Sequence, residues 1–293
     1  MNGTVKGYLL GIIAAITYGM NPLFGLHLYR DGLLPGSVLF YRFLFASILL
    51  GGIMLIRKDS FRLPKHQFFH VLAGGLLLAA SCNTWYLSFQ IMDSGIGAAI
   101  MFVYPIMVAA IMVIGFKEKL TGRTIAGVLL ALIGVAVLCR PGEGAKINVA
   151  GVVYVLISSL TYAVYIVEVK VSRLKEMQPE TLTFYAMVIG GLYFLVFLGF
   201  GRNLQMLPSF TALGNALGLA FFPSLLSFLL MAIAIRYIGA TKTAILGALE
   251  PVTAVCIGLF VFGEKFTWPL LIGIILVMAS VMTVIAGGKE KSA

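Results

Sequence analysis

The chain has 293 residues, of which 60% are hydrophobic and only 11% are charged, and its formal net charge is +10. Soluble domains carry about 25% charged residues, so this composition cannot cover a water-facing surface and excludes a soluble enzyme or a disordered chain. The lipid bilayer is therefore the expected solvent. The net charge alone would suggest a nucleic-acid partner. In a membrane protein, however, an excess of Lys and Arg marks cytoplasmic loops, so we interpret the positive charge in this way.

Ten predominantly apolar stretches are predicted to cross the membrane as helices, since about 20 such residues span the hydrocarbon. The connections between them are short, and none has room for a globular domain. The first stretch is too long for the apolar core of a signal peptide and is expected to remain as a helix. The ten stretches are residues 8–29, 34–56, 68–91, 94–115, 122–139, 149–171, 181–200, 211–235, 241–262 and 267–286.

The basic residues predict the orientation of these ten helices. An even number of crossings puts both termini on one side, and a cytoplasmic N-terminus places most of the 21 Lys and Arg residues in cytoplasmic segments. Cytoplasmic loops carry such an excess, so both termini are expected in the cytoplasm. The outer segments then hold only Arg30, Arg140, Lys146, Arg202 and Lys265, while Arg42 lies within a helix.

The two halves of the chain resemble each other. Thr17-Tyr18 returns as Thr161-Tyr162 after 144 residues, and the later matches, such as Pro105 with Pro251, follow at 146 residues. Each half holds five predicted helices, an odd number, so the second half must enter the membrane in the opposite sense. The sequence thus predicts two inverted repeats, residues 6–140 and 148–286, a feature of secondary transporters. A duplicated structural bundle without a transport role is the alternative.

Several motifs resemble the EamA family of the drug/metabolite transporter superfamily. They are the early helix-2 segment Tyr-Arg-Phe-Leu-Phe-Ala (41–46), the paired segments 115–121 and 263–267 with their Glu-Lys pairs, and Glu250-Pro251. The resemblance covers nearly the whole chain. It implies an all-α integral membrane protein of ten helices in two inverted five-helix repeats, located in the bacterial inner membrane and exporting a small metabolite.

Two charged residues are predicted to lie near the bilayer midplane, where polar groups are costly and mark function. Arg42 lies about 12 Å from the outer end of its helix, and Glu250 about 13 Å from the inner end of its own, at 1.5 Å per residue. Transporter sites form at this depth, so Arg42 is a candidate carboxylate anchor and Glu250 a candidate ammonium or proton site. A fixed structural ion pair, or an Arg42 side chain reaching the interface, is the alternative.

Other polar and aromatic residues in the apolar stretches are further candidates for a substrate cavity. The amide and aromatic ones are the better candidates to line it, whereas each serine is more readily explained as part of a hydrogen-bonding seam between helices. Pro105 and Pro251 each remove a backbone hydrogen bond and are predicted to kink their helices. The remaining candidates are Tyr18, Asn21, Trp85, Tyr104, Tyr165, Ser81 and Ser227.

No cofactor or metal site is predicted. His66 and His70 have HxxxH spacing, but no further ligand joins them, and a zinc site needs more. Cys82, Cys139 and Cys256 lie in apolar runs without CxxC spacing, which predicts neither a disulfide framework nor a zinc site. The sequence also lacks a P-loop, a Gly-x-Ser-x-Gly elbow and an HExxH motif, so it predicts neither an ATP-driven pump nor an enzyme.

Together these features predict a secondary-active exporter of a small polar or zwitterionic metabolite, an amino acid or related compound, that works by alternating access. A proton is the candidate coupling ion, and the protein is expected as a monomer or homodimer. A carrier of nucleotide sugars, phosphorylated metabolites or drugs is one alternative. A membrane enzyme and a non-transporting receptor are others.

The predicted orientation can be tested with reporter fusions at Ala293 and within residues 140–148. Ten crossings place these two positions on opposite sides of the membrane, with Ala293 in the cytoplasm, because five helices separate the two points. Alkaline phosphatase and green fluorescent protein activities report the two sides. If both fusions report the same side, the predicted number of helices is wrong.

Overall fold

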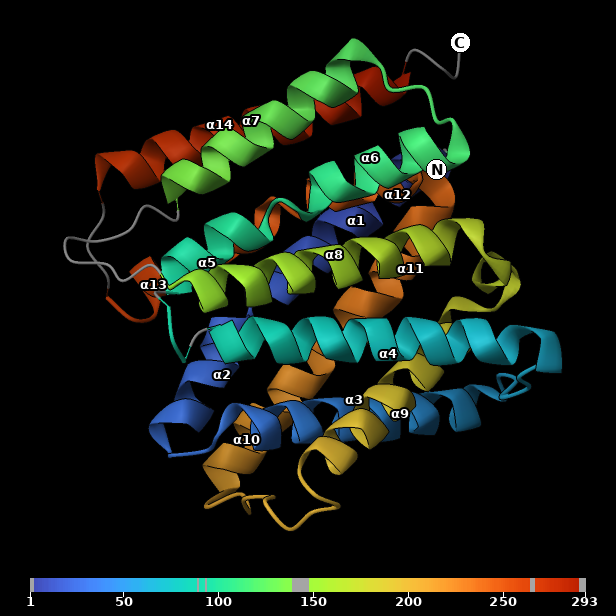
Figure 1. Ribbon diagram of the computed structural model, residues 1–293, viewed down its shortest axis with the longest axis vertical. Coiled ribbons are helices and arrows are strands. Elements are labelled where there is room, and N and C mark those ends of the chain that lie inside the picture. Colours follow the sequence, from blue (N-terminus) through green and yellow to red (C-terminus); the bar gives the residue numbers. More distant parts are fainter. Residues whose placement is uncertain (1–2, 89, 93, 139–147, 264–266, 290–293) are drawn as a thin grey trace.

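A computed structural model describes residues 3–88, 90–92, 94–138, 148–263 and 267–289. Within these ranges every regular element is a helix (Figure 1). The sequence arguments on orientation, motifs and cysteines also used Cys139, Arg140, Lys146, Glu264 and Lys265, which lie outside the described residues.

The helices follow one another with short connections. The first half of the chain holds α1 (Gly3–Gly19), α2 (Asn21–Arg30), α3 (Pro35–Arg57), α4 (Lys65–Ser88), α5 (Ser94–Met101), α6 (Tyr104–Phe116) and α7 (Gly122–Leu138). The second half holds α8 (Val149–Val171), a 3₁₀ turn η1 (Arg173–Glu176), α9 (Pro179–Phe197), α10 (Phe210–Ala220), a π-helical turn η2 (Phe221–Leu226), α11 (Ser227–Ile238), α12 (Ala240–Leu246), α13 (Leu249–Phe260) and α14 (Trp268–Lys289).

Eight helical stretches of the described chain are long and apolar enough to cross a membrane. Two shorter apolar helices, Tyr104–Phe116 and Gly122–Leu138, fall below that length. Large apolar side chains point outward from the helices: Ile56 is 84% exposed, Ile114 is 83% exposed and Phe260 is 86% exposed. Such exposure is costly in water and favourable in lipid, so the protein is an integral membrane protein.

Four of the ten predicted stretches are interrupted, and a proline lies at each interruption. Pro22, Pro105 and Pro251 lie in the first turns of α2, α6 and α13, and Pro223 lies in the π-helical turn between α10 and α11. Proline lacks an N–H and its ring collides with the preceding turn. The kinks predicted at Pro105 and Pro251 are confirmed, whereas the π-helical turn at Pro223 was not predicted.

Each of these prolines frees the carbonyl four residues before it, and each freed carbonyl has another donor. An unsatisfied carbonyl in the membrane interior is expensive, so these substitute bonds are needed for the breaks to persist. The bonds are Asn21 Nδ2 to Tyr18 O at 2.7 Å, Ser159 Oγ to Met101 O at 3.0 Å, Ser224 Oγ to Leu219 O at 3.0 Å, and Glu250 N to Gly247 O at 2.9 Å.

Long helices of one half pack against long helices of the other. The largest contacts join α7 to α14, α4 to α8, α1 to α11 and α3 to α9, and Figure 1 shows the α7–α14 and α3–α9 pairs at opposite edges of the molecule. This list is unchanged when each helix is replaced by its counterpart in the other half. For example, α1 packs on α11, and its counterpart α8 packs on α4, the counterpart of α11. The centre of the molecule therefore lies between the halves.

The short helices break this symmetry of contacts. In the second half α12 packs against α1, α6 and α7 of the first half. The counterpart of the α12–α6 contact is α5 with α13, and the described residues show no comparable packing there. One end of the interface between the halves is therefore closed more tightly than the other.

Glycines permit the closest approaches between the halves. In the α7–α14 pair, a Cβ atom on Gly134 would lie 2.9 Å from the backbone nitrogen of Val277. Backbone cannot move aside as a side chain can, so even one methyl group must separate the two helices.

We therefore expect Gly134→Ala to destabilise the fold by about 1–3 kcal/mol, the usual cost of overpacking. The matched control is Gly52→Ala in the middle of α3, where nothing lies within 4 Å of the added atom. Thermal unfolding in detergent should show a lower melting temperature for Gly134→Ala only. Equal melting temperatures for the two variants would contradict the close α7–α14 contact.

Candidate functional site

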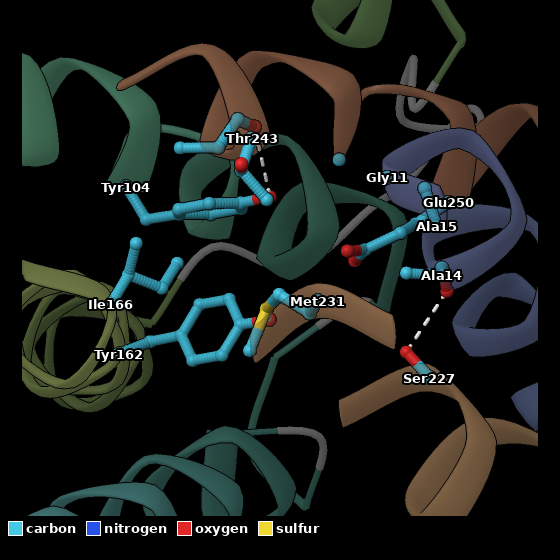
Figure 2. A pocket seen from close by; sticks show the side chains of 12 residues that line it. Gly11, Ala14, Ala15, Tyr104, Tyr162, Ile166, Ser227, Met231, Thr243 and Glu250 are labelled. Atoms are coloured by element: carbon cyan, nitrogen blue, oxygen red, sulfur yellow. Dashed lines mark hydrogen bonds between the residues drawn. The ribbon is translucent and has the colours of Figure 1, made fainter. Parts of the chain in front are cut away.

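A small pocket lies between the two halves, and its walls come from α1, α6, α8, α11, α12 and α13 (Figure 2). In this conformation its cavity volume is about 10 Å³, roughly the room that one water molecule needs. Small residues of α1 and α12 (Gly11, Ala14, Ala15, Ala244 and Gly247) and Ile166 form much of the wall. The polar, aromatic and sulfur-bearing groups are Tyr104, Tyr162, Ser227, Met231, Thr243 and Glu250.

Glu250 supplies the acidic group of the pocket. It lies in the first turn of α13, directly before Pro251, and the break between α12 and α13 brings it to the centre of the molecule. Figure 2 shows its carboxylate pointing toward the middle of the pocket. Within the described residues no side chain donates a hydrogen bond to this carboxylate, and none forms an ion pair with it. Such a carboxylate is ready to receive a cation or a proton.

Two tyrosines and a methionine face Glu250 across the pocket. The rings of Tyr104 and Tyr162 meet edge to face with centroids 5.0 Å apart. The Tyr104 hydroxyl donates to the Ala244 carbonyl at 3.1 Å, and the Tyr162 hydroxyl donates to the Met231 sulfur at 3.3 Å. Aromatic faces attract positively charged groups, so these rings are chemically compatible with a cationic group beside the Glu250 carboxylate.

Arg42 occupies a separate, enclosed place beside the pocket. It is only 1% exposed, and its guanidinium donates to Ser224 Oγ at 2.6 Å, Asn21 Oδ1 at 3.1 Å and the Pro223 carbonyl at 3.1 Å. The guanidinium carbon lies 5.4 Å from the ring centroid of Tyr18. The π-helical turn supplies two of these acceptors, so this irregularity in the chain is what accommodates the buried charge.

Arg42 and Glu250 influence each other electrostatically, but they form no ion pair. The ion pairs found among the described residues are Arg57 with Asp59, and His70 with Glu168 when the imidazole is protonated. The structural pair considered from the sequence is thus not formed in this structure. Arg42 is held by neutral acceptors, and its charge is one of those acting on Glu250 across the membrane interior.

The structure distributes the sequence-predicted residues over several places. Glu250, Tyr104 and Ser227 line the pocket, and the Ser227 hydroxyl donates to the Ala14 carbonyl at 2.9 Å. Arg42, Tyr18 and Asn21 form the enclosed group beside it.

The other three predicted residues lie outside the pocket. Ser81 is bonded to Ser158 in the contact between α4 and α8, at 3.1 Å between their hydroxyl oxygens. Tyr165 lies beside Gly74 on the same contact, and Trp85 packs with a separate apolar cluster around Met92.

Several pocket residues were missed from the sequence. Tyr162 is part of the internal repeat but was not assigned to the site, and Met231 was not assigned either. Tyr162 is the repeat counterpart of Tyr18, and this correspondence was a signal that could have found it. The small residues Gly247 and Ala244 gave no such signal, because small residues are common wherever membrane helices pack.

No arrangement of metal ligands is found in the described part of the chain, where no three His, Cys, Asp or Glu residues gather. His70 Nδ1 lies 3.4 Å from Glu168 Oε1. Cys82 is a buried free cysteine and Cys256 a partly buried one.

Comparisons with known proteins agree with this architecture. The sequence model of the EamA-like transporter family matches residues 5–140 and again residues 149–286. An uncharacterized transporter of Archaeoglobus fulgidus is 27% identical over 272 residues, covering 92% of this chain and 93% of the relative. An S-adenosylmethionine uptake transporter of Rickettsia prowazekii is 24% identical and covers 99% of this chain and 97% of the relative.

A solved crystal structure has the same fold, with a TM-score of 0.85 over 99% of both chains at 15% sequence identity. The helical membrane fold and these relatives together define a multi-pass membrane transport protein. The chain belongs to the EamA-like transporter family.

The enclosed position of Arg42 leads to a prediction about stability. Arg42→Ala leaves the Asn21 amide oxygen and the Pro223 carbonyl without their donor, at about 1–3 kcal/mol for each buried orphan, and it leaves a cavity. A clearly lower melting temperature in detergent is expected, while Arg202→Ala at an exposed loop position should melt like the wild type. Unchanged melting of Arg42→Ala would show that the three hydrogen bonds do not support the fold.

Proposed function

We propose that the protein is a secondary carrier that moves a small polar metabolite with a positively charged group across the bacterial inner membrane. The observation that carries this proposal is the Glu250 carboxylate, which points into a pocket between the halves without a protein cation beside it. A charged group in the membrane interior is costly, so its retention without a partner favours a ligand as the partner.

The proposed mechanism is alternating access between two inverted repeats, residues 6–140 and 148–286, in ten crossings with both termini cytoplasmic. Two observations support the repeats. The family matches the chain twice, and the contacts between long helices are unchanged when the halves are exchanged. Inverted repeats supply two related conformations around a fixed central site. In this scheme the two shorter apolar helices, α6 and α7, belong to the two crossings that bring the eight long stretches to ten.

The substrate class follows from which charges reach the pocket. A zwitterion, such as an amino acid, would place its ammonium group on Glu250. Arg42 could meet its carboxylate only by giving up its present acceptors, because it is enclosed in this conformation. Phosphorylated metabolites and nucleotide sugars are disfavoured, since their negative charges would face a carboxylate.

A sulfonium compound is a second candidate substrate. Met231, Tyr104 and Tyr162 line the pocket together with Glu250, and aromatic rings beside a carboxylate favour a weakly hydrated cation. The Rickettsia relatives named for S-adenosylmethionine uptake add support. The carrier would have to open further to admit a molecule of that size.

The test is counterflow in proteoliposomes with S-adenosylmethionine and a panel of amino acids as probes. Glu250→Gln keeps the shape of the side chain and removes its charge and its exchangeable proton, so flux of the transported probe should fall at least about tenfold while the melting temperature stays close to the wild type. Glu176→Gln, at an exposed carboxylate outside the pocket, is the matched control.

Near wild-type flux by a folded Glu250→Gln protein at several pH values would remove Glu250 from the mechanism. If the wild-type protein chemically converts a probe in detergent, where there are no two compartments, the membrane enzyme is favoured instead.

A further inference from the structure

One hydrogen bond closes the pocket at its α12 end. The Tyr104 hydroxyl reaches across from α6 and donates to the Ala244 carbonyl at 3.1 Å. Gly247 makes room for it, because a Cβ atom there would overlap the Tyr104 hydroxyl. We name Tyr104, Ala244 and Gly247 the α12 gate.

The repeat relation gives every member of this gate a counterpart 146 residues away. Tyr104 corresponds to Glu250, Ala244 to Ala98 on α5, and Gly247 to Met101 on α5. We name Glu250, Ala98 and Met101 the α5 gate. Tyr162, whose ring packs on Tyr104, corresponds at 144 residues to Tyr18. Tyr18 lies on α1, which meets α13 so closely that a Cβ atom on Gly19 would lie 2.5 Å from the Glu250 carbonyl.

The two gates are in different states in this structure. The α12 gate is closed by its hydrogen bond, and α12 packs on α6. The α5 gate is not closed, because α5 and α13 show no comparable packing within the described residues and the Glu250 carboxylate has no hydrogen bond there. Alternating access about a pseudo-two-fold axis exchanges these states, so the opposite conformation brings Glu250 toward Ala98 as Tyr104 now meets Ala244.

The sizes of the gate residues fit this exchange. The long Tyr104 side chain faces Gly247, which has no side chain. The shorter Glu250 would face Met101, whose flexible side chain fills the space that a tyrosine takes at the other gate. Each gate thus pairs a larger residue with a smaller one, in opposite order.

The chemistry of the α5 gate differs from that of the α12 gate in one respect. A tyrosine hydroxyl always has a proton to donate to a carbonyl, whereas an ionised carboxylate is acceptor-only and a protonated carboxyl has one O–H donor. Facing the Ala98 carbonyl, an ionised Glu250 would be a buried charge opposite a carbonyl dipole, which is strongly unfavourable. We propose that the α5 gate of the empty carrier closes only when Glu250 carries a proton, which makes Glu250 the binding site of a coupling proton.

The titratable groups around Glu250 are few. The groups that interact electrostatically with Glu250 are Tyr18 of α1, Arg42 of α3, Tyr104 of α6 and Tyr162 of α8.

The other helices that pack on α13 add none nearby. His27 and Arg30 of α2 lie at the Phe262 ring, beyond the far end of α13. Arg123 lies in the first turn of α7, and α14 has no titratable residue before Lys289. Lys242 of α12 lies over the Tyr8 ring, 5.9 Å from its centroid. Glu250 is therefore the group at the α5 gate whose protonation can turn an unfavourable contact, the one with the Ala98 carbonyl, into a favourable one.

This inference rests on the proposed function, but its test reads conformation rather than transport. Spin labels at Ile91, beside α5, and at Phe260, at the end of α13, report the α5 gate by the distance between them. Both positions are exposed, and the native cysteines are replaced by alanine. The full-length protein in lipid nanodiscs is measured by double electron–electron resonance at several pH values between about 5 and about 8, which brackets the range in which a buried carboxyl titrates.

In the wild type the population with the shorter distance should rise several-fold as the pH falls, since protonation favours closure. Glu250→Gln has a permanent amide donor and should show the shorter distance in a pH-independent proportion. Gly247→Ala should raise the short-distance population at every pH, because its Cβ takes the place of the Tyr104 hydroxyl and opens the α12 gate.

A wild-type response to pH that persists in Glu250→Gln would overturn the proposal, as would a wild-type distance that ignores pH. If Glu250→Gln does not fold, Gly247→Ala decides: a folded variant whose distance distribution equals the wild type contradicts the two-gate account. If the wild type shows these distance changes but transports none of the probes, the proposed function is refuted and the account of the gate stands.

Discussion

The structure depends on how a membrane interior deals with two opposite charges that do not pair. Arg42 is surrounded by neutral acceptors that satisfy three of its donors, and Glu250 faces a pocket. If the two had formed a direct ion pair, each would neutralise the other and the pocket would lose its charge. Holding Arg42 apart keeps Glu250 available while leaving a positive charge nearby.

Prolines create the irregular backbone on which this arrangement depends. Pro251 places Glu250 at a helix start beside the pocket, Pro223 opens the turn that receives Arg42, and Pro22 lies next to Asn21, which bonds both Arg42 and the freed Tyr18 carbonyl. Broken helices at membrane depth are tolerated where they are buried or line a cavity. Pro105 separates α5 from α6 as Pro251 separates α12 from α13, so the two short helices beside the pocket also result from proline.

Periodicity and composition predicted the apolar helices, and the proline rule predicted the breaks at Pro105 and Pro251, because both depend on local chemistry. The enclosure of Arg42 could not be predicted in this way, since it needs acceptors in a π-helical turn 181 and 182 residues further along the chain. The serines show the same limit: Ser81 and Ser227 each donate to a carbonyl across a helix contact, that of Ser158 or Ala14, yet only Ser227 also borders the pocket. Tyr162 was within reach of the repeat pattern, whereas Gly247 becomes meaningful only once Tyr104 is seen against it.

The central claim is that Glu250 takes up and releases a proton while facing the pocket. The most direct measurement is an infrared difference spectrum of the reconstituted protein between acidic and alkaline buffer, in which a protonated carboxyl has its own C=O stretching band. The account predicts a band that is lost on raising the pH in the wild type and is missing from Glu250→Gln, with the same change in the Glu176→Gln control as in the wild type. A difference spectrum in which Glu250→Gln retains that band, or in which the wild type shows none, would contradict it.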